Sequence, residues 1–100
     1  MSTLEDFIAD LDEKMALSEI RRLIENGVEP KKILAMTQKG LHIVGERFEK
    51  KQYALIELEM ADLLFRECVN VIETLSGEKY AELNIIDDNM LKKSEMTDLG

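Results

Sequence analysis

The residue best suited to chemistry in this 100-residue chain is its single histidine, His42, within the stretch KGLHIVGERF at positions 39–48. An imidazole can ligate a metal or transfer a proton near neutral pH. Glu46 follows four residues later, so a helix would place the two side chains on one face. Two ligands are too few for a closed metal site. We therefore expect His42 to be a partly exposed helical side chain, and the sequence predicts no metal site.

Other residue combinations give no better case for catalysis. One histidine supports no nucleophile–base pair, and the sequence lacks a glycine-rich phosphate loop. Cys68 lies in an apolar stretch, which favours an inert, buried thiol. The carboxylates of Glu57, Glu59 and Asp62 lack the Glu-x-x-His pattern of di-iron bundles. We expect no catalytic residues and no enzymatic activity.

Composition limits the classes of partner. Hydrophobic residues make up 45% of the chain, charged residues 34%, and the net charge is −8. This acidity disfavours nucleic acid and anionic membranes, because phosphate binding needs a basic patch. No apolar run approaches the roughly 20 residues that span a bilayer, and the N-terminus lacks the pattern of a secretory signal. With one cysteine and no internal disulfide, a cytoplasmic location is expected.

The elements that must position these residues are predicted to be helices. A capping-box pattern at Ser2 and Glu5 starts a short helix, and clustered charge near Leu11–Lys14 breaks it. A second helix then runs to Asn26-Gly27, and Pro30 opens a third that contains His42. Gly40 and Gly45 within this third helix suggest close helix packing, because each costs roughly 1 kcal/mol against alanine.

A fourth helix is predicted from about Tyr53 to Leu75, ending at Ser76-Gly77. It is apolar on two sides, which predicts a central position in the fold. One side carries Leu55, Leu58, Phe65, Val69 and Ile72, and the other carries Met60, Leu64, Cys68, Val71 and Leu75. The first side is expected to be buried together with Leu41, Val44 and Phe48.

These elements predict an all-α fold, a small antiparallel four-helix bundle over residues 1–77. Residues 78–100 are polar. A weak pattern of Tyr80, Leu83 and Ile86 predicts at most a weakly helical or frayed segment there.

The order of three stretches carries a family resemblance: LIENGVEPKKIL at 23–34, GLHIVGERFE at 40–49 and LIELEMA at 55–61. Together they resemble the helical cap domain of methyltransferase corrinoid proteins, a family that includes cobalamin-dependent methionine synthase. The resemblance covers roughly residues 17–75. It implies a four-helix bundle that covers the upper, methyl-bearing face of cobalamin. A separate Rossmann-like domain would supply the cobalt-ligating histidine from an Asp-x-His-x-x-Gly signature.

The resemblance also explains His42. Its His-x-x-Gly spacing to Gly45 matches half of that signature, but Gly40 stands where the signature needs aspartate, and no strand precedes it. In the family, the Val-Gly-Glu-x-Phe run belongs to the cap and has no ligand role. The ligating histidine is therefore expected in another domain.

Carrying the family pattern over gives five candidate cofactor-binding residues, which are Tyr53, Ala54, Leu58, Ala61 and Asp62. Ala54 stands where the family has an aromatic residue over the corrin, and Tyr53 precedes it. Asp62 places a carboxylate where the family is apolar or small, which is costly unless the charge is paired.

The resemblance implies a cap module that works with a Rossmann-like cobalamin-binding domain or a methyltransferase partner, and that does no chemistry itself. By itself the chain is expected to bind cobalamin only weakly. The alternative is a diverged bundle that no longer binds cobalamin and acts through protein–protein contacts as a homodimer. In that case the interface would include residues 53–64, which keep several apolar side chains.

Overall fold

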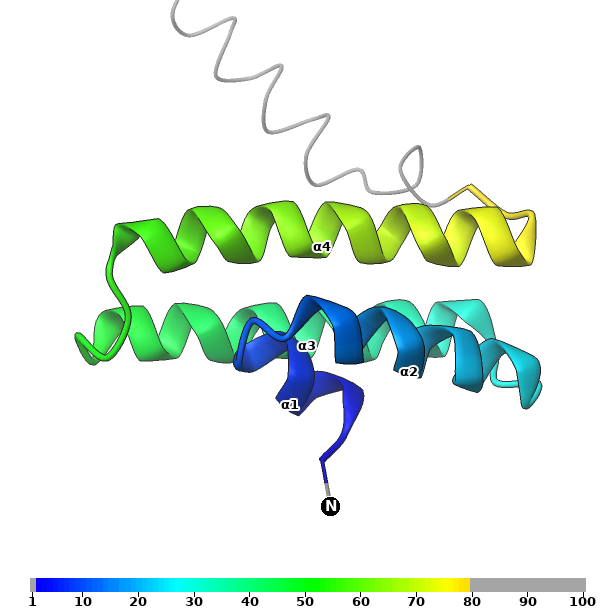
Figure 1. Ribbon diagram of the computed structural model, residues 1–100, viewed down its shortest axis with the longest axis horizontal. Coiled ribbons are helices and arrows are strands. Elements are labelled where there is room, and N and C mark those ends of the chain that lie inside the picture. Colours follow the sequence, from blue (N-terminus) through cyan, green and yellow to red (C-terminus); the bar gives the residue numbers. More distant parts are fainter. Residues whose placement is uncertain (1, 80–100) are drawn as a thin grey trace, which may run out of the picture.

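The computed structural model describes residues 2–79, which form four helices and no strand. The helices are α1 (Leu4–Ala9), α2 (Glu13–Glu25), α3 (Pro30–Glu49) and α4 (Leu55–Ser76). α3 and α4 lie side by side in opposite directions, α2 packs against α4, and the short α1 packs mainly against α3 (Figure 1). The predicted all-α bundle is confirmed. The expectations for Tyr80, Leu83 and Ile86 lie outside the described residues.

The helix ends follow local capping rules. The side chain of Asp12 caps α2 by accepting from the Met15 N–H at 3.2 Å. Gly27 follows α2 in the left-handed region at φ 83°, and Gly77 ends α4 at φ 78°. Pro30 is the first residue of α3, as predicted. Glycine takes a positive φ without the steric cost that a Cβ brings, which is why both stop positions were visible in the sequence.

The start of α1 differs by one residue from the prediction. Thr3, and not Ser2, is the N-cap: its hydroxyl accepts from the Asp6 N–H at 3.3 Å, and the Asp6 carboxylate accepts from the Thr3 N–H at 2.9 Å. Two overlapping capping patterns are present in the sequence. The one that is used leaves Leu4 as the first helical residue and buries it.

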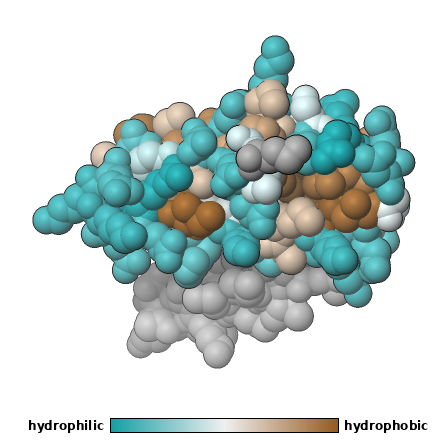
Figure 2. Space-filling view, turned by 90° about the horizontal axis from the view of Figure 1, so that it is seen from below, coloured by the Kyte–Doolittle hydropathy of each residue, from teal (hydrophilic) through white to brown (hydrophobic). Residues whose placement is uncertain are grey.

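The core lies where α4 meets the other helices. Its buried side chains are Leu4, Ile8, Ala16, Ile20, Ile33, Leu64, Cys68, Val71 and Ile72. Viewed from the α1 side, the outer surface is mostly hydrophilic, with hydrophobic residues in separate areas (Figure 2). Within residues 2–79, every helix is too short or too polar to span a bilayer.

α4 contacts all three other helices, but most of the expected burial of its first apolar side is wrong. Leu64, Cys68 and Val71 of one predicted face are buried, but of the other face only Ile72 is buried, and Leu55 is 62% exposed. Of the residues expected to be buried with that side, Val44 is buried as predicted, Leu41 is partly buried, and Phe48 is exposed. Leu58, Phe65 and Val69 of α4 are also only partly buried. α4 packs mainly against α3 and α2 and makes few contacts with the short α1, so part of its surface stays uncovered.

The two helical glycines differ in their surroundings. A Cβ added at Gly40 would lie 2.8 Å from the Ile8 Cβ and 3.0 Å from the Glu5 carbonyl oxygen. Gly40 therefore allows α1 to approach α3 closely, as the sequence suggested. A Cβ at Gly45 would meet nothing within 4 Å, so the expectation of close packing there is wrong.

Candidate functional site

The connection between α3 and α4 is a short, well-fixed reversal of the chain. The Arg47 carbonyl oxygen accepts from the Gln52 N–H at 2.8 Å and from the Tyr53 N–H at 3.2 Å. Lys51 adopts φ 63°, a left-handed conformation that is uncommon for residues other than glycine. These contacts hold the residues of the connection at one end of the bundle.

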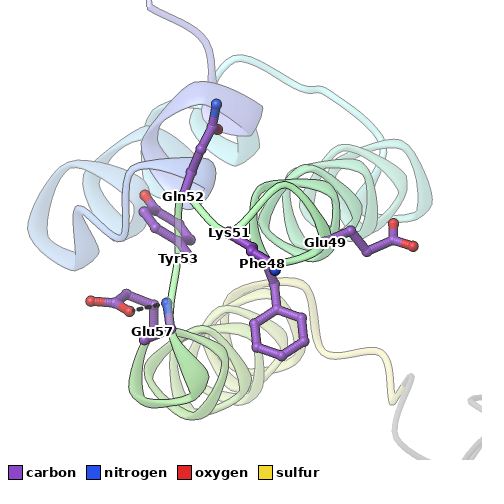
Figure 3. A pocket seen from close by; sticks show the side chains of 7 residues that line it. Phe48, Glu49, Lys51, Gln52, Tyr53 and Glu57 are labelled. Atoms are coloured by element: carbon purple, nitrogen blue, oxygen red, sulfur yellow. Dashed lines mark hydrogen bonds between the residues drawn. The ribbon is translucent and has the colours of Figure 1, made fainter.

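An open hollow of about 660 Å³ lies at this end. Its lining residues are Phe48, Glu49, Lys51, Gln52, Tyr53, Ala54 and Glu57. Figure 3 shows the Phe48 ring directed toward the edge of α4, whereas Glu49 points away. Phe48 is 39% exposed. An aromatic ring left open at the rim of a hollow offers an apolar surface to a flat ligand.

Tyr53 has a structural role on the other side of the hollow. Its hydroxyl donates to the Ala9 carbonyl oxygen at 2.7 Å, next to the end of α1. The Arg47 Nη1 donates to the same oxygen at 2.8 Å, to the Asp10 Oδ1 at 2.9 Å and to the Tyr53 hydroxyl at 3.0 Å.

These contacts form a small network, which we call the Arg47–Tyr53 lock. The Arg47 guanidinium carbon lies 5.5 Å from the centre of the Tyr53 ring, within the range of a cation–π interaction. The hydrogen bond to Asp10 is the main reason why the pKa of Arg47 is above its ordinary value, and the hydrogen bond to Tyr53 adds to it. The Tyr53 hydroxyl is thus used to fasten α1 to the α3–α4 connection.

Ala54 occupies the N-cap position of α4 with only half of a capping box. The Glu57 carboxylate accepts from the Ala54 N–H at 2.6 Å, but alanine has no side-chain oxygen to accept from the first turn in return. Ala54 also lines the hollow, where its small side chain leaves space.

Completing this capping box should stabilise the protein. We expect Ala54→Ser to raise the free energy of unfolding by about 0.5–2 kcal/mol, because a serine hydroxyl can accept from an unpaired N–H of the first turn. Urea denaturation of both proteins measures the difference. Ala54→Val is the control, because valine has no acceptor and should bring no gain. Equal stabilisation by both variants would contradict the capping explanation.

The other three candidate residues lie outside the hollow. Leu58 is partly buried on α4, and Ala61 is completely buried, so Ala61 presents no surface to a ligand. Asp62 is exposed and forms an ion pair with Arg66 at 3.2 Å. The structure therefore brings Tyr53 and Ala54 together at one hollow and adds Phe48. The sequence pattern missed Phe48 because it assigned this ring to the core.

His42 lies in the middle of α3 with an exposed side chain. It lines a shallow hollow of about 460 Å³ together with Glu46, so the predicted shared face is confirmed. In the described part of the chain, no group of three or more potential metal ligands occurs.

Cys68 is buried, as predicted. Burial is the main cause that raises the pKa of its thiol to about 12, and the negative charges of Glu13 and Glu67 add to the effect.

Comparison with known proteins gives a family match. The family model described as the B12 binding domain matches residues 2–73. This range contains all four helices except the last turn of α4, and it includes the hollow at the α3–α4 connection. No curated protein and no solved structure matches the chain significantly.

Proposed function

The chain belongs to the B12 binding domain family, and from this premise we propose that it covers the upper face of a cobalamin that another protein domain holds. The family match identifies a cobalamin-associated helical cap module, a type of domain that works with a partner cobalamin-binding domain. The covering role, its geometry and its partner are our proposals.

The observation that carries this proposal is the hollow beside the α3–α4 connection. Phe48 exposes part of its ring there, and Ala54 adds only a methyl group. The apolar part of this surface, at Phe48 and Ala54, suits the flat face of a corrin, although Ala54 stands where the family has an aromatic residue. Leu58 is partly buried next to it on α4, whereas Ala61 is too deeply buried to take part.

The residues at and near the hollow would have passive tasks in this arrangement. When bound, cobalamin supplies a cobalt ion that can carry a methyl group. Phe48 and Ala54 would exclude water from the covered face. The Arg47–Tyr53 lock would keep the α3–α4 connection in place by holding it to the end of α1. None of these tasks needs a catalytic group, so we propose that the chain does no chemistry itself.

The partner in this proposal is a Rossmann-like cobalamin-binding domain or a methyltransferase. It would supply the lower histidine ligand, because His42 lies on the helical surface of α3 and is part of no group of three or more potential metal ligands within residues 2–79. Residues 1–77 would act as one module.

Cobalamin titration is the direct test of how much the chain binds alone. We expect a dissociation constant weaker than about 100 μM, or roughly −5.5 kcal/mol, because the chain offers one open, mostly apolar surface and no strong ligand. The visible spectrum of methylcobalamin during titration with purified chain measures this. A complex that survives gel filtration with a histidine-shifted spectrum would contradict the expectation.

The covering role itself needs a loaded partner. We expect the chain to slow photolysis of methylcobalamin bound to a Rossmann-like domain, and Phe48→Ala to lose most of this protection. Leu75→Ala is the matched control, because Leu75 is also an exposed apolar residue, 45% exposed, but lies near the other end of α4. No protection by the wild-type chain, or equal losses in both variants, would argue against the cap.

A homodimeric interaction module is the second candidate. It draws on the exposed apolar side chains of Leu55, Ile56, Met60 and Leu63 in the first half of α4. Light scattering distinguishes a monomer from a dimer. A dimer with an association free energy near −5.5 kcal/mol becomes detectable at about 100 μM. A monomer mass of 11.5 kDa that persists to this concentration would exclude a stable dimer.

A further inference from the structure

An exposed apolar strip runs along the first half of α4, on a different side from its core residues. It consists of Ile56, Met60 and Leu63, which are 57%, 47% and 67% exposed. Their spacing of four and then three residues places them on one helical face. We call these three residues the α4 strip. Along the same stretch of helix, Ala61 and Leu64 are buried toward the core.

The strip continues into a third hollow. Leu11, from the connection between α1 and α2, and Glu13, the first residue of α2, line a hollow of about 270 Å³ together with Met60, Leu63 and Leu64 of α4. This volume accommodates one or two large apolar side chains. It shares no lining residue with the hollow at Phe48 and Ala54.

The surroundings of the strip are acidic. Glu13 lines the hollow itself, and Glu59 and Glu67 project from α4 beside the strip. The charges of Glu13 and Glu67 both contribute to the raised pKa of Cys68, which shows that they lie near the same part of α4. Ion pairs do form elsewhere within residues 2–79, including Arg66 with Asp62, but none is found for these three glutamates.

We infer that the α4 strip and its hollow are a docking surface for a basic amphipathic helix of a partner protein. Apolar side chains of that helix would enter the hollow and cover Met60 and Leu63. Lysine or arginine residues at its edges would face Glu13, Glu59 and Glu67. This is the helix-in-groove mode of recognition, in which apolar anchors recur at three- and four-residue spacing.

Charge favours such a partner over a second copy of the chain. Two copies related by a two-fold axis would present the same surface to each other. The glutamates beside one strip would then lie against the glutamates beside the other, within a chain whose net charge is already −8. A basic partner turns the same carboxylates into attractive contacts.

A designed peptide provides the test. The probe is a fluorescent helical 18-residue peptide of leucine and lysine, with its leucines on one face, and anisotropy measures its binding to the full chain. A peptide with glutamate in place of lysine, and one with the same composition in scrambled order, are the controls. We expect the amphipathic basic peptide to bind at least about tenfold more tightly than either control.

Variants of the chain locate the binding surface. Leu63→Ser should weaken binding about tenfold, whereas Leu75→Ser, at an exposed leucine of the same helix outside the strip, should change it less than about twofold. Glu67→Gln should weaken binding and reduce its salt dependence, and Glu25→Gln, an exposed site on α2, should not. Circular dichroism verifies that each variant is folded.

Three outcomes would overturn the inference. Equal binding of the scrambled peptide would mean that charge alone attracts it. A dimer in light scattering that Leu63→Ser dissolves would assign the strip to a second copy. Loss of methylcobalamin protection in Leu63→Ser, with peptide binding intact, would assign the strip to the cofactor face. Because the strip and the Phe48 hollow are tested by different variants, docking can fail while the proposed cap function stands.

Discussion

Ile72→Ala is expected to lower the free energy of unfolding by about 2–5 kcal/mol, because it removes a large side chain from a closed core. Ile72 has 0% of its surface exposed and belongs to the main buried cluster between α4 and the other helices. A domain of this size is stabilised by only about 5–15 kcal/mol. The loss should therefore be obvious in urea denaturation followed by circular dichroism.

Leu63→Ala is the control for this prediction. It truncates a similar aliphatic side chain on the same helix, but Leu63 is 67% exposed. We expect a change within about 0.5 kcal/mol, as for most surface substitutions. If Leu63→Ala were as destabilising as Ile72→Ala, the assignment of the buried face of α4 would be wrong.

Gly40→Ala is expected to destabilise the protein although alanine is the better helix former. The new Cβ would lie 2.8 Å from the Ile8 Cβ, 2.9 Å from the Ile8 Cγ2 and 3.0 Å from the Glu5 carbonyl oxygen. Because one of these atoms belongs to the backbone of α1, rotation of a side chain cannot relieve the contact. The overpacking cost of about 1–3 kcal/mol should exceed the helix-propensity gain of about 1 kcal/mol.

Gly45→Ala, on the same helix, should have the opposite sign. A Cβ there meets nothing within 4 Å, so the helix-propensity gain of up to about 1 kcal/mol should remain. Thermal unfolding of the two variants measures the difference. A stabilising shift for Gly40→Ala would contradict the close packing of α1 on α3 at this residue.

The packing at Gly40 also bears on the proposed site. α1 rests on α3 through Ile8, and its end at Ala9 and Asp10 receives the Arg47–Tyr53 lock. A displaced α1 would pull these acceptors away from Arg47 and Tyr53. We therefore expect Gly40→Ala to loosen the α3–α4 connection as well as to lower stability.

The sequence by itself determined the helices and their order. Gly27, Pro30 and Gly77 mark helix ends through backbone preferences that depend on the residue alone. The order of short motifs around them identified the family, and the match over residues 2–73 confirms it. The capping box of α1 was located to within one residue, since Ser2 and Thr3 both offer a hydroxyl.

The tertiary structure alone decided which surfaces are buried. Gly40 and Gly45 look equivalent in the sequence, yet only Gly40 lies under another helix. Tyr53 resembled a ligand-facing aromatic residue, but its hydroxyl donates a hydrogen bond to the Ala9 carbonyl oxygen, 44 positions away in the chain. The sequence pattern of α4 predicted burial of both of its apolar faces. Which one is buried depends on the length and placement of its neighbours, and α1 has only six residues. Leu64, Cys68 and Ile72 of α4 pack into the core, whereas Phe48 and the α4 strip remain exposed, and no local pattern encodes this difference.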